Sequence, residues 1–201
     1  GVILILDETH TICAGPQGAS RLWGIDADML VIGKTIGGGI PVAAYGMSSE
    51  VAVKVEALMH GHDLDVSGIG GTLSGSALAG AAIRATLTHA LRQEDFDIAI
   101  PLATRWSTGV QAIIDQHDLP WTVQQLGCRA EYWFSEHPQN GAQAAASVND
   151  GLESFMHLYA LNRGILLTPF HNMALMTPFH SEEDVDLHTS VFSDCVRELV
   201  S

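Results

Sequence analysis

The chain has 201 residues and a formal net charge of −14, from 9 basic and 23 acidic side chains. Because nucleic acids and anionic membrane surfaces attract basic proteins, this charge argues against both as partners. Apolar residues make up 47% of the sequence and charged residues only 16%, which indicates a globular chain with a sizeable core.

Cysteine usage and hydropathy indicate the compartment. The three cysteines, Cys13, Cys128 and Cys195, are far apart and form no C-x-x-C pair, which is typical of reduced thiols in a cytoplasmic protein. No apolar stretch reaches the roughly 18 residues of a membrane helix. No charged segment precedes the opening apolar run, so we expect no signal peptide.

The N-terminal part, up to about residue 94, has the pattern of an α/β fold. The apolar run at residues 2–6 predicts a parallel strand buried on both faces, and because domains rarely begin with a central strand we expect further chain upstream. Glycines and a proline predict a loop at residues 10–24. Further elements are predicted in chain order: strands at 29–32 and 41–47, a helix at 49–58, a long loop at 59–75 and a helix at 76–93.

The C-terminal part is predicted to be a smaller α+β unit. A helix at 95–117 would join the two parts and end before Pro120. The elements expected after it are a strand at 121–134, a surface loop at 136–150, a helix at 151–163 closed by Gly164, short strands at 165–168 and 173–176, and a helix at 181–200 capped by Ser181. We therefore predict a first domain at 1–118, which includes the connecting helix, and a small domain at 119–201.

Asp7 directly follows the first predicted strand, where ligands bind in open α/β sheets. A carboxylate at this position can hold a protonated ring nitrogen, because the opposite charge stabilises the protonated form. The alternative is a solvated Asp7-Glu8 pair in a loop, and the segment alone favours that alternative.

Lys34 follows the next predicted strand and precedes Gly37-Gly38-Gly39. At a crowded site of this kind a lysine amine can act as a nucleophile and form a Schiff base. One alternative is a surface lysine beside a glycine turn. A phosphate loop of the G-x-x-x-x-G-K-[ST] type is excluded, because Asp28 stands where the first glycine is required.

Glycines and hydroxyl side chains fill residues 70–76, directly before a predicted helix. Free backbone N–H groups and hydroxyls at a helix start can bind an anion such as a phosphate. The alternative is a flexible linker that ends in a helix cap.

These three features, in this order, resemble the class III aminotransferases, in the branch of glutamate-1-semialdehyde aminomutase and the β-amino-acid aminotransferases. Residues 33–47 follow the family pattern G-K-x-[IL]-G-G-G-x-P-x-x-A-[YF]-G-G, with Met47 as the departure. Residues 71–79 follow G-T-[LF]-S-G-N-P-L-A, with Ser-Ala in place of Asn-Pro. The resemblance spans nearly the whole chain and weakens after Pro120. It implies part of a fold type I large domain, a mostly parallel sheet with helices on both faces, and a smaller α+β domain.

The resemblance implies pyridoxal 5′-phosphate (PLP) as cofactor and gives roles to particular residues. Lys34 would form the Schiff base and move protons, and Asp7 would pair with the pyridine nitrogen. Thr9 stands where the family packs Val or Ile against the ring, and His10 could touch the ring oxygen. Gly71 and Thr72 would reach the phosphate held by the neighbouring subunit, which implies a homodimer.

The implied reaction is transfer of an amino group between an amino acid and a keto acid. Two alternatives are kept: an aminomutase, which is an isomerase that returns the amine to a neighbouring carbon, and a non-catalytic truncated remnant of the PLP fold. In the family, the phosphate cup and the aromatic residue that stacks on PLP lie upstream of the segment that matches Gly1. The upstream half of the enzyme is therefore an expected partner.

A substrate carboxylate usually requires an arginine. Arg163 is the first candidate, with capping of the helix at 151–163 as its alternative, and Arg129 is a weaker one. His171 lies in the segment 169–173 that the resemblance places at the substrate pocket, which favours a β-amino acid donor. His60, His62 and Asp63 form the best local metal pattern, but a metal site needs further convergent ligands, so none is predicted.

Overall fold

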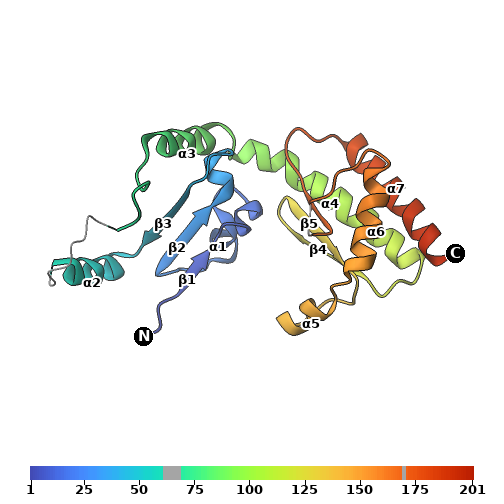
Figure 1. Cartoon of the computed structure of the whole chain (residues 1–201), viewed down its shortest axis with the longest axis horizontal. Helices are drawn as coiled ribbons and strands as arrows, with labels where there is room; N and C mark the ends of the chain where they lie inside the picture. Colours follow the sequence, from blue (N-terminus) through green and yellow to red (C-terminus); the bar gives the residue numbers. More distant parts are fainter. Residues whose placement is uncertain (61–68, 169–170) are drawn as a thin grey trace. The chain divides into compact units, whose positions relative to one another are not determined.

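The computed structural model describes residues 1–60, 69–168 and 171–201. Its contacts divide the chain into two compact units, Gly1–Arg92 and Gln93–Ser201 (Figure 1). This division differs from the boundary predicted after residue 118. Helix α4 (Gln93–Gln116), expected to belong to the first domain, packs against β4, β5 and α7 of the second unit. Its apolar face is therefore part of the C-terminal core.

The sheet of the N-terminal unit contains β1 (Ile5–Asp7), β2 (Met29–Gly33) and β3 (Ala43–Met47), in that order. Strand β1 runs parallel to β2, whereas β2 and β3 are antiparallel. The prediction of a mostly parallel sheet is therefore corrected to a small mixed one. The physical reason is the connection at residues 34–42, which is shorter than the dozen or more residues that a parallel crossover needs.

Strand β1 lies at an edge of this sheet, and the apolar run that leads into it is solvent-exposed. Ile3, Leu4 and Ile5 are 49%, 44% and 55% exposed. The expectation of a strand buried on both faces is therefore wrong for the part of the chain that the structure describes. An edge strand has a neighbour on one side only, and no described element covers these side chains.

The helices of this unit are, in chain order, α1 (Gly18–Trp23), α2 (Ser49–His60) and α3 (Ala77–His89). Helices α2 and α3 confirm the helices predicted there. The predicted loop at 10–24 instead contains α1 and a 3-10 turn, η1 (Thr11–Ala14), which pack against each other. A second 3-10 turn, η2 (Lys34–Gly37), follows β2 and contacts α3.

The sheet of the C-terminal unit is antiparallel, with β5 (Arg129–Trp133) between β4 (Thr122–Leu126) and β6 (Met173–Leu175). The single strand expected at 121–134 is a hairpin, because Gly127 adopts a left-handed φ of 56° and reverses the chain. The expected strand at 173–176 is β6, whereas residues 165–168 form no strand.

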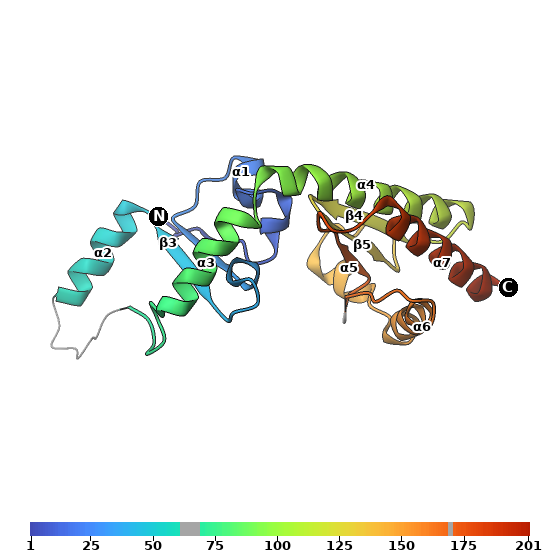
Figure 2. The same cartoon turned by 90° about the horizontal axis from the view of Figure 1, so that it is seen from above.

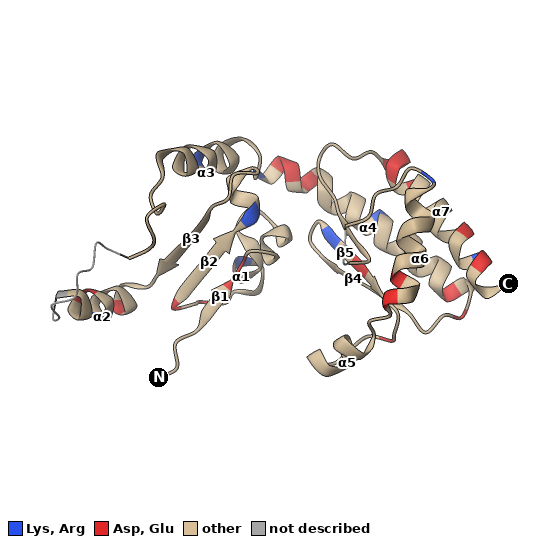
Figure 3. Cartoon of the chain, viewed as in Figure 1, with Lys and Arg blue, Asp and Glu red and all other residues tan. Residues whose placement is uncertain are grey.

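Polar side chains cap the starts of three helices of the C-terminal unit. Helix α5 (Gly141–Ala146), in the segment expected to be a loop, and α6 (Asp150–Leu161) start after Asn140 and Asn149, whose side chains accept backbone N–H groups. Ser181 and Asp184 form the capping box of α7 (Glu182–Val200), as the sequence predicts. Acidic side chains lie in the first turns of α4, α6 and α7 (Figure 3). They stabilise these helices, because the N-terminal end of a helix carries a partial positive charge.

An aromatic cluster from α4, β5 and α7 forms the core of this unit. Helix α4 packs along α7 and against β4 and β5 (Figure 2). Trp106 of α4 is 1% exposed, and its ring centroid lies 6.2 Å from that of Tyr132 and 5.1 Å from that of His188. Phe192 of α7 packs edge-on against Tyr132 at 5.1 Å. These large side chains stabilise the unit mainly by removing apolar area from water.

His188 is predicted to make this unit acid-sensitive. Burial lowers the pKa of His188 to about 4 from its ordinary 6.5, and Nδ1 has no hydrogen-bond partner among the described residues. As the pH falls below 6.5, the His188 imidazole therefore stays neutral in the folded state but takes up a proton in the unfolded state. Stability should fall as pH drops from 6.5 to about 4, by about 3 kcal/mol in total.

Urea unfolding across that pH range, followed by tryptophan fluorescence, measures this loss. His188→Phe should remove most of the pH dependence, whereas the control His137→Gln, at an exposed histidine of the same unit, should keep it. If the free energy of unfolding fell equally steeply with decreasing pH in His188→Phe and in the wild type, the assignment to His188 would be contradicted.

No helix in the described part of the chain combines the length and hydropathy that crossing a bilayer requires. The three cysteines, Cys13, Cys128 and Cys195, are all buried.

Candidate functional site

The two parallel strands of the N-terminal sheet bring Asp7 and Lys34 to the same end of the sheet. This carboxyl end of β1 and β2 is called the strand edge below. Asp7 is the last residue of β1, and Lys34 directly follows β2. In the register of the pair, Asp7 lies opposite Val31. Because β1 and β2 are parallel, their carboxyl ends meet at this edge, where ligands bind in α/β sheets.

Lys34 and His10 are in direct contact at this edge. The distance between Lys34 Nζ and His10 Nε2 is 2.6 Å, and both side chains are exposed. The backbone of Lys34 has a left-handed φ of 49° and begins the turn η2, beside Gly33 and Gly37, which are both buried. An amine and an imidazole in contact are suited to binding an electrophilic group and moving protons on it.

Asp7 is held in its charged form. Its Oδ1 accepts a hydrogen bond from the backbone N–H of Thr9 at 2.9 Å. The hydrogen bonds from the Thr9 side chain and backbone, together with the charges of His10 and Lys34, hold the pKa of Asp7 below its ordinary 3.8. The edge therefore combines a carboxylate, an amine and an imidazole within mutual electrostatic reach.

Glu8 is the residue at this edge that sequence reasoning missed. It is 3% exposed, so the alternative of a solvated Asp7-Glu8 pair is wrong for Glu8. Its carboxylate accepts hydrogen bonds from the hydroxyl of Thr11 and from the backbone N–H groups of Ala19, at 3.1 Å, and Ser20, at 2.6 Å. The only sequence signal was its position beside Asp7, which does not distinguish a buried carboxylate from a solvated one.

Gly71 and Thr72, predicted to reach a phosphate, lie in the exposed segment before α3. Gly70 and Gly75 in this segment have left-handed φ angles of 121° and 72°. Within the described part of the chain, no hydrogen bond joins Thr72 to Asp7 or Lys34. The position of Thr72 at the surface is compatible with a role toward another subunit, which stays a prediction.

Arg163 lies in the C-terminal unit and has contacts that fit helix capping. Its guanidinium donates to the carbonyl of Tyr159 at 3.2 Å and lies 3.4 Å from the centroid of the Tyr159 ring. It also lies 4.0 Å from a carboxylate oxygen of Glu198. These contacts favour the capping alternative over a carboxylate-binding role.

His171 and Arg129 meet on a shared carboxylate in the C-terminal unit. Glu131 Oε1 lies 3.2 Å from His171 Nδ1, and Glu131 Oε2 accepts from Arg129 at 3.0 Å. Sequence reasoning did not identify Glu131. The segment 169–173, proposed as pocket lining, is only partly described, because Pro169 and Phe170 lie outside the described residues.

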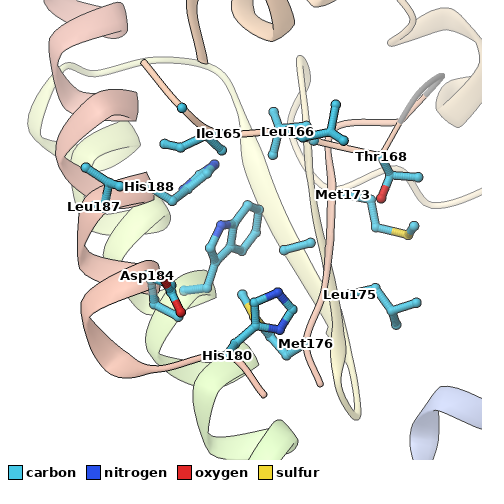
Figure 4. A pocket seen from close by; sticks show the side chains of 15 residues that line it. Ile165, Leu166, Thr168, Met173, Leu175, Met176, His180, Asp184, Leu187 and His188 are labelled. Carbon is cyan, nitrogen blue, oxygen red and sulfur yellow. The ribbon is translucent and has the colours of Figure 1, made fainter. Parts of the chain in front are cut away.

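A cavity of about 340 Å³ lies within the C-terminal unit. It is lined by the segment 164–168, β6, α4 and α7, with His180, Asp184 and His188 as polar groups and Ile165, Leu166 and Met173 as apolar ones (Figure 4). No group of three metal-ligating side chains is found in the described residues. His62 and Asp63, and the side chain of His60, fall outside them.

The chain is similar to glutamate-1-semialdehyde 2,1-aminomutases. The relative from Staphylococcus haemolyticus is 30% identical over 100% of this chain and 46% of its own length. The relative from Thermus thermophilus is 34% identical over 92% of this chain and 43% of its own length. Among solved structures, a variant glutamate-1-semialdehyde aminomutase from Pseudomonas aeruginosa in complex with PMP has a TM-score of 0.94 and 44% identity over 98% of this chain and 45% of that one.

The chain thus spans slightly less than half the length of these relatives. A profile of the family described as aminotransferase class III matches residues 1–196. This match covers both compact units, and it includes the edge that holds Asp7, His10 and Lys34. The chain belongs to the class III aminotransferase family.

Proposed function

We propose that the chain carries the lysine-bearing half of a PLP enzyme that works as an aminomutase of the glutamate-1-semialdehyde type. The observation that carries the PLP site is the contact of Lys34 with His10 at the strand edge that ends in Asp7. The reaction type rests on the three relatives described above, each of which is named a glutamate-1-semialdehyde aminomutase. They favour this alternative over the aminotransferase, and none of them supports the expected β-amino acid donor.

The residues present fit the cofactor. Lys34 supplies a primary amine for its aldehyde, Asp7 a carboxylate for its ring nitrogen, and His10 a donor or acceptor for its ring oxygen. When bound, PLP withdraws electrons from the amine-bearing carbon of a substrate. Gly37 leaves little free volume beside it, because a Cβ there would come within 2.6 Å of the Val42 side chain. The chain behind Lys34 is therefore packed tightly.

In this proposal the chain's own groups orient the cofactor and handle the protons. Asp7 keeps a proton on the ring nitrogen, since its low pKa leaves it negatively charged at neutral pH. Lys34 Nζ takes a proton from one carbon of the substrate and returns it to the neighbouring one. His10 Nε2, 2.6 Å from Nζ, orients that amine. Thr72 would contribute to a phosphate site across a homodimer interface, and the upstream half would complete the cofactor site.

The experiment supplies the full-length protein and PLP with glutamate-1-semialdehyde as the only substrate. An aminomutase converts it into its amine-shifted isomer without any keto acid, and NMR detects that isomer. Turnover that needs an added keto acid would support the aminotransferase instead. No turnover, together with no covalent cofactor on Lys34, would indicate the non-catalytic remnant.

A further inference from the structure

The buried carboxylate of Glu8 belongs to the residue directly before Thr9 and His10. Its 3% exposure is unusual for a glutamate, because burying a carboxylate is costly unless hydrogen bonds replace its hydration. Here the hydroxyl of Thr11 and the backbone N–H groups of Ala19 and Ser20 supply them. Burial raises the pKa of Glu8, but these hydrogen bonds outweigh it and leave the pKa below 4.5. Glu8 is therefore a charged group that fastens residues 8–11 to the start of α1.

The packing around this carboxylate is tight. Gly18 has a left-handed φ of 70°, and a Cβ there would lie 2.8 Å from the carboxylate atoms of Glu8. The backbone of Glu8 is fixed as well, since its N–H donates to Val31 of β2 at 2.7 Å and its carbonyl accepts from Ile12 at 3.0 Å. Through its backbone and side chain, Glu8 thus connects the end of β1 with β2, η1 and α1.

We propose that Glu8 is a positioning residue that holds the turn of residues 9–11 so that His10 contacts Lys34 and Thr9 contacts Asp7. Glu8 itself takes part in neither contact, because its carboxylate accepts hydrogen bonds from Thr11, Ala19 and Ser20. The inference concerns the same edge as the proposed function and rests on it for its meaning in catalysis. Its structural part, the link from Glu8 to the Lys34 amine through His10, can be tested without any cofactor.

The chain offers an internal reference for that test, since Lys34 and Lys54 are its two lysines. Lys54 lies on α2 and pairs with Glu50 at 2.8 Å, and no recorded contact joins it to Glu8. Cofactor-free full-length protein would be treated briefly with acetic anhydride, and mass spectrometry would give the ratio of acetylation at Lys34 to that at Lys54. A hydrogen bond to His10 restrains the Lys34 amine, so its loss should speed acetylation of Lys34 alone.

In Glu8→Gln the amide N–H₂ replaces one carboxylate oxygen and faces a backbone N–H group that donates to that oxygen in the wild type. The turn of residues 9–11 should therefore lose hydrogen bonds that hold it in place. We expect the Lys34-to-Lys54 ratio to rise about threefold or more, the effect of losing one modest hydrogen bond. His10→Gln should raise the ratio similarly, and the double variant should add little to either single change, because both act on one contact. The control Glu56→Gln removes an exposed carboxylate of α2 and should leave the ratio unchanged.

A lowered melting temperature in Glu8→Gln with an unchanged ratio would overturn the proposal and leave Glu8 a purely structural residue. Additive effects of Glu8→Gln and His10→Gln would overturn it too. If Glu8→Gln does not fold, Thr11→Val removes one of the hydrogen bonds and should raise the ratio to a smaller extent. Failure of the wild-type protein to bind PLP would refute the proposed function without affecting this result.

Discussion

Lys34→Ala is expected to abolish covalent attachment of PLP and to lower turnover by at least about 10³-fold, because the change removes both the anchoring nucleophile and the proton-transferring amine. Borohydride reduction of the protein with PLP, followed by peptide mass mapping, would find the adduct on Lys34 in the wild type and no adduct there in the variant. The fold should persist, since the Lys34 side chain is exposed and its recorded contact is with His10.

Lys54→Ala is the matched control, because Lys54 is the other lysine and its amine pairs with Glu50 on the surface of α2. This variant should keep both the adduct and the turnover. A wild-type adduct on Lys54 or on the N-terminal amine would mean that the strand edge is not the PLP site.

Asp7→Asn is expected to lower turnover by about 10²- to 10⁴-fold, since a neutral amide does not hold a proton on a ring nitrogen as a carboxylate does. The amide oxygen can still accept the N–H of Thr9, so the local backbone should be retained. Steady-state kinetics would measure the loss, and the melting temperature would check the fold. Asp26→Asn, at an exposed aspartate between α1 and β2, is the control and should behave as the wild type.

The pH profile provides a second check on Asp7. Because its pKa is depressed below 3.8, the charge of Asp7 is lost only as pH falls below that value. Asp7 should therefore contribute no loss of activity between pH 7 and about 5. In Asp7→Asn the ring nitrogen loses the carboxylate that keeps it protonated, so its own titration should alter the acid side of the profile. An unchanged profile in Asp7→Asn would contradict the pairing of Asp7 with the ring nitrogen.

Much of the candidate site could be predicted from the sequence because it follows from local patterns. The two apolar runs that end in Asp7 and Lys34 form parallel strands, and the geometry of such pairs brings their ends together. The cap at Ser181 and the left-handed Gly164 are likewise determined by a few neighbouring residues. The contact of His10 with Lys34, 24 positions apart, needed the register of β1 on β2 to become visible.

The remaining differences come from interactions that sequence patterns do not encode. The donors to Glu8 lie three to twelve positions away and include two backbone N–H groups, which carry no residue signature. Helix α4 is long and amphipathic and stands between the two compact units in the sequence. The aromatic cluster around Trp106 makes it part of the C-terminal unit. The contacts of Arg163 with the carbonyl and ring of Tyr159, one helical turn earlier, likewise have no sequence signature, and its carboxylate-binding role stays a prediction.

The left-handed backbone at Lys34 has a consequence for the evolution of this edge. A side chain other than glycine pays roughly 1 kcal/mol to adopt that conformation. Selection for stability alone would therefore favour glycine at this position, in a segment already rich in glycine. A copy of the gene released from its function should lose the lysine early, and the persistence of Lys34 in a diverging lineage would indicate that its amine is still in use.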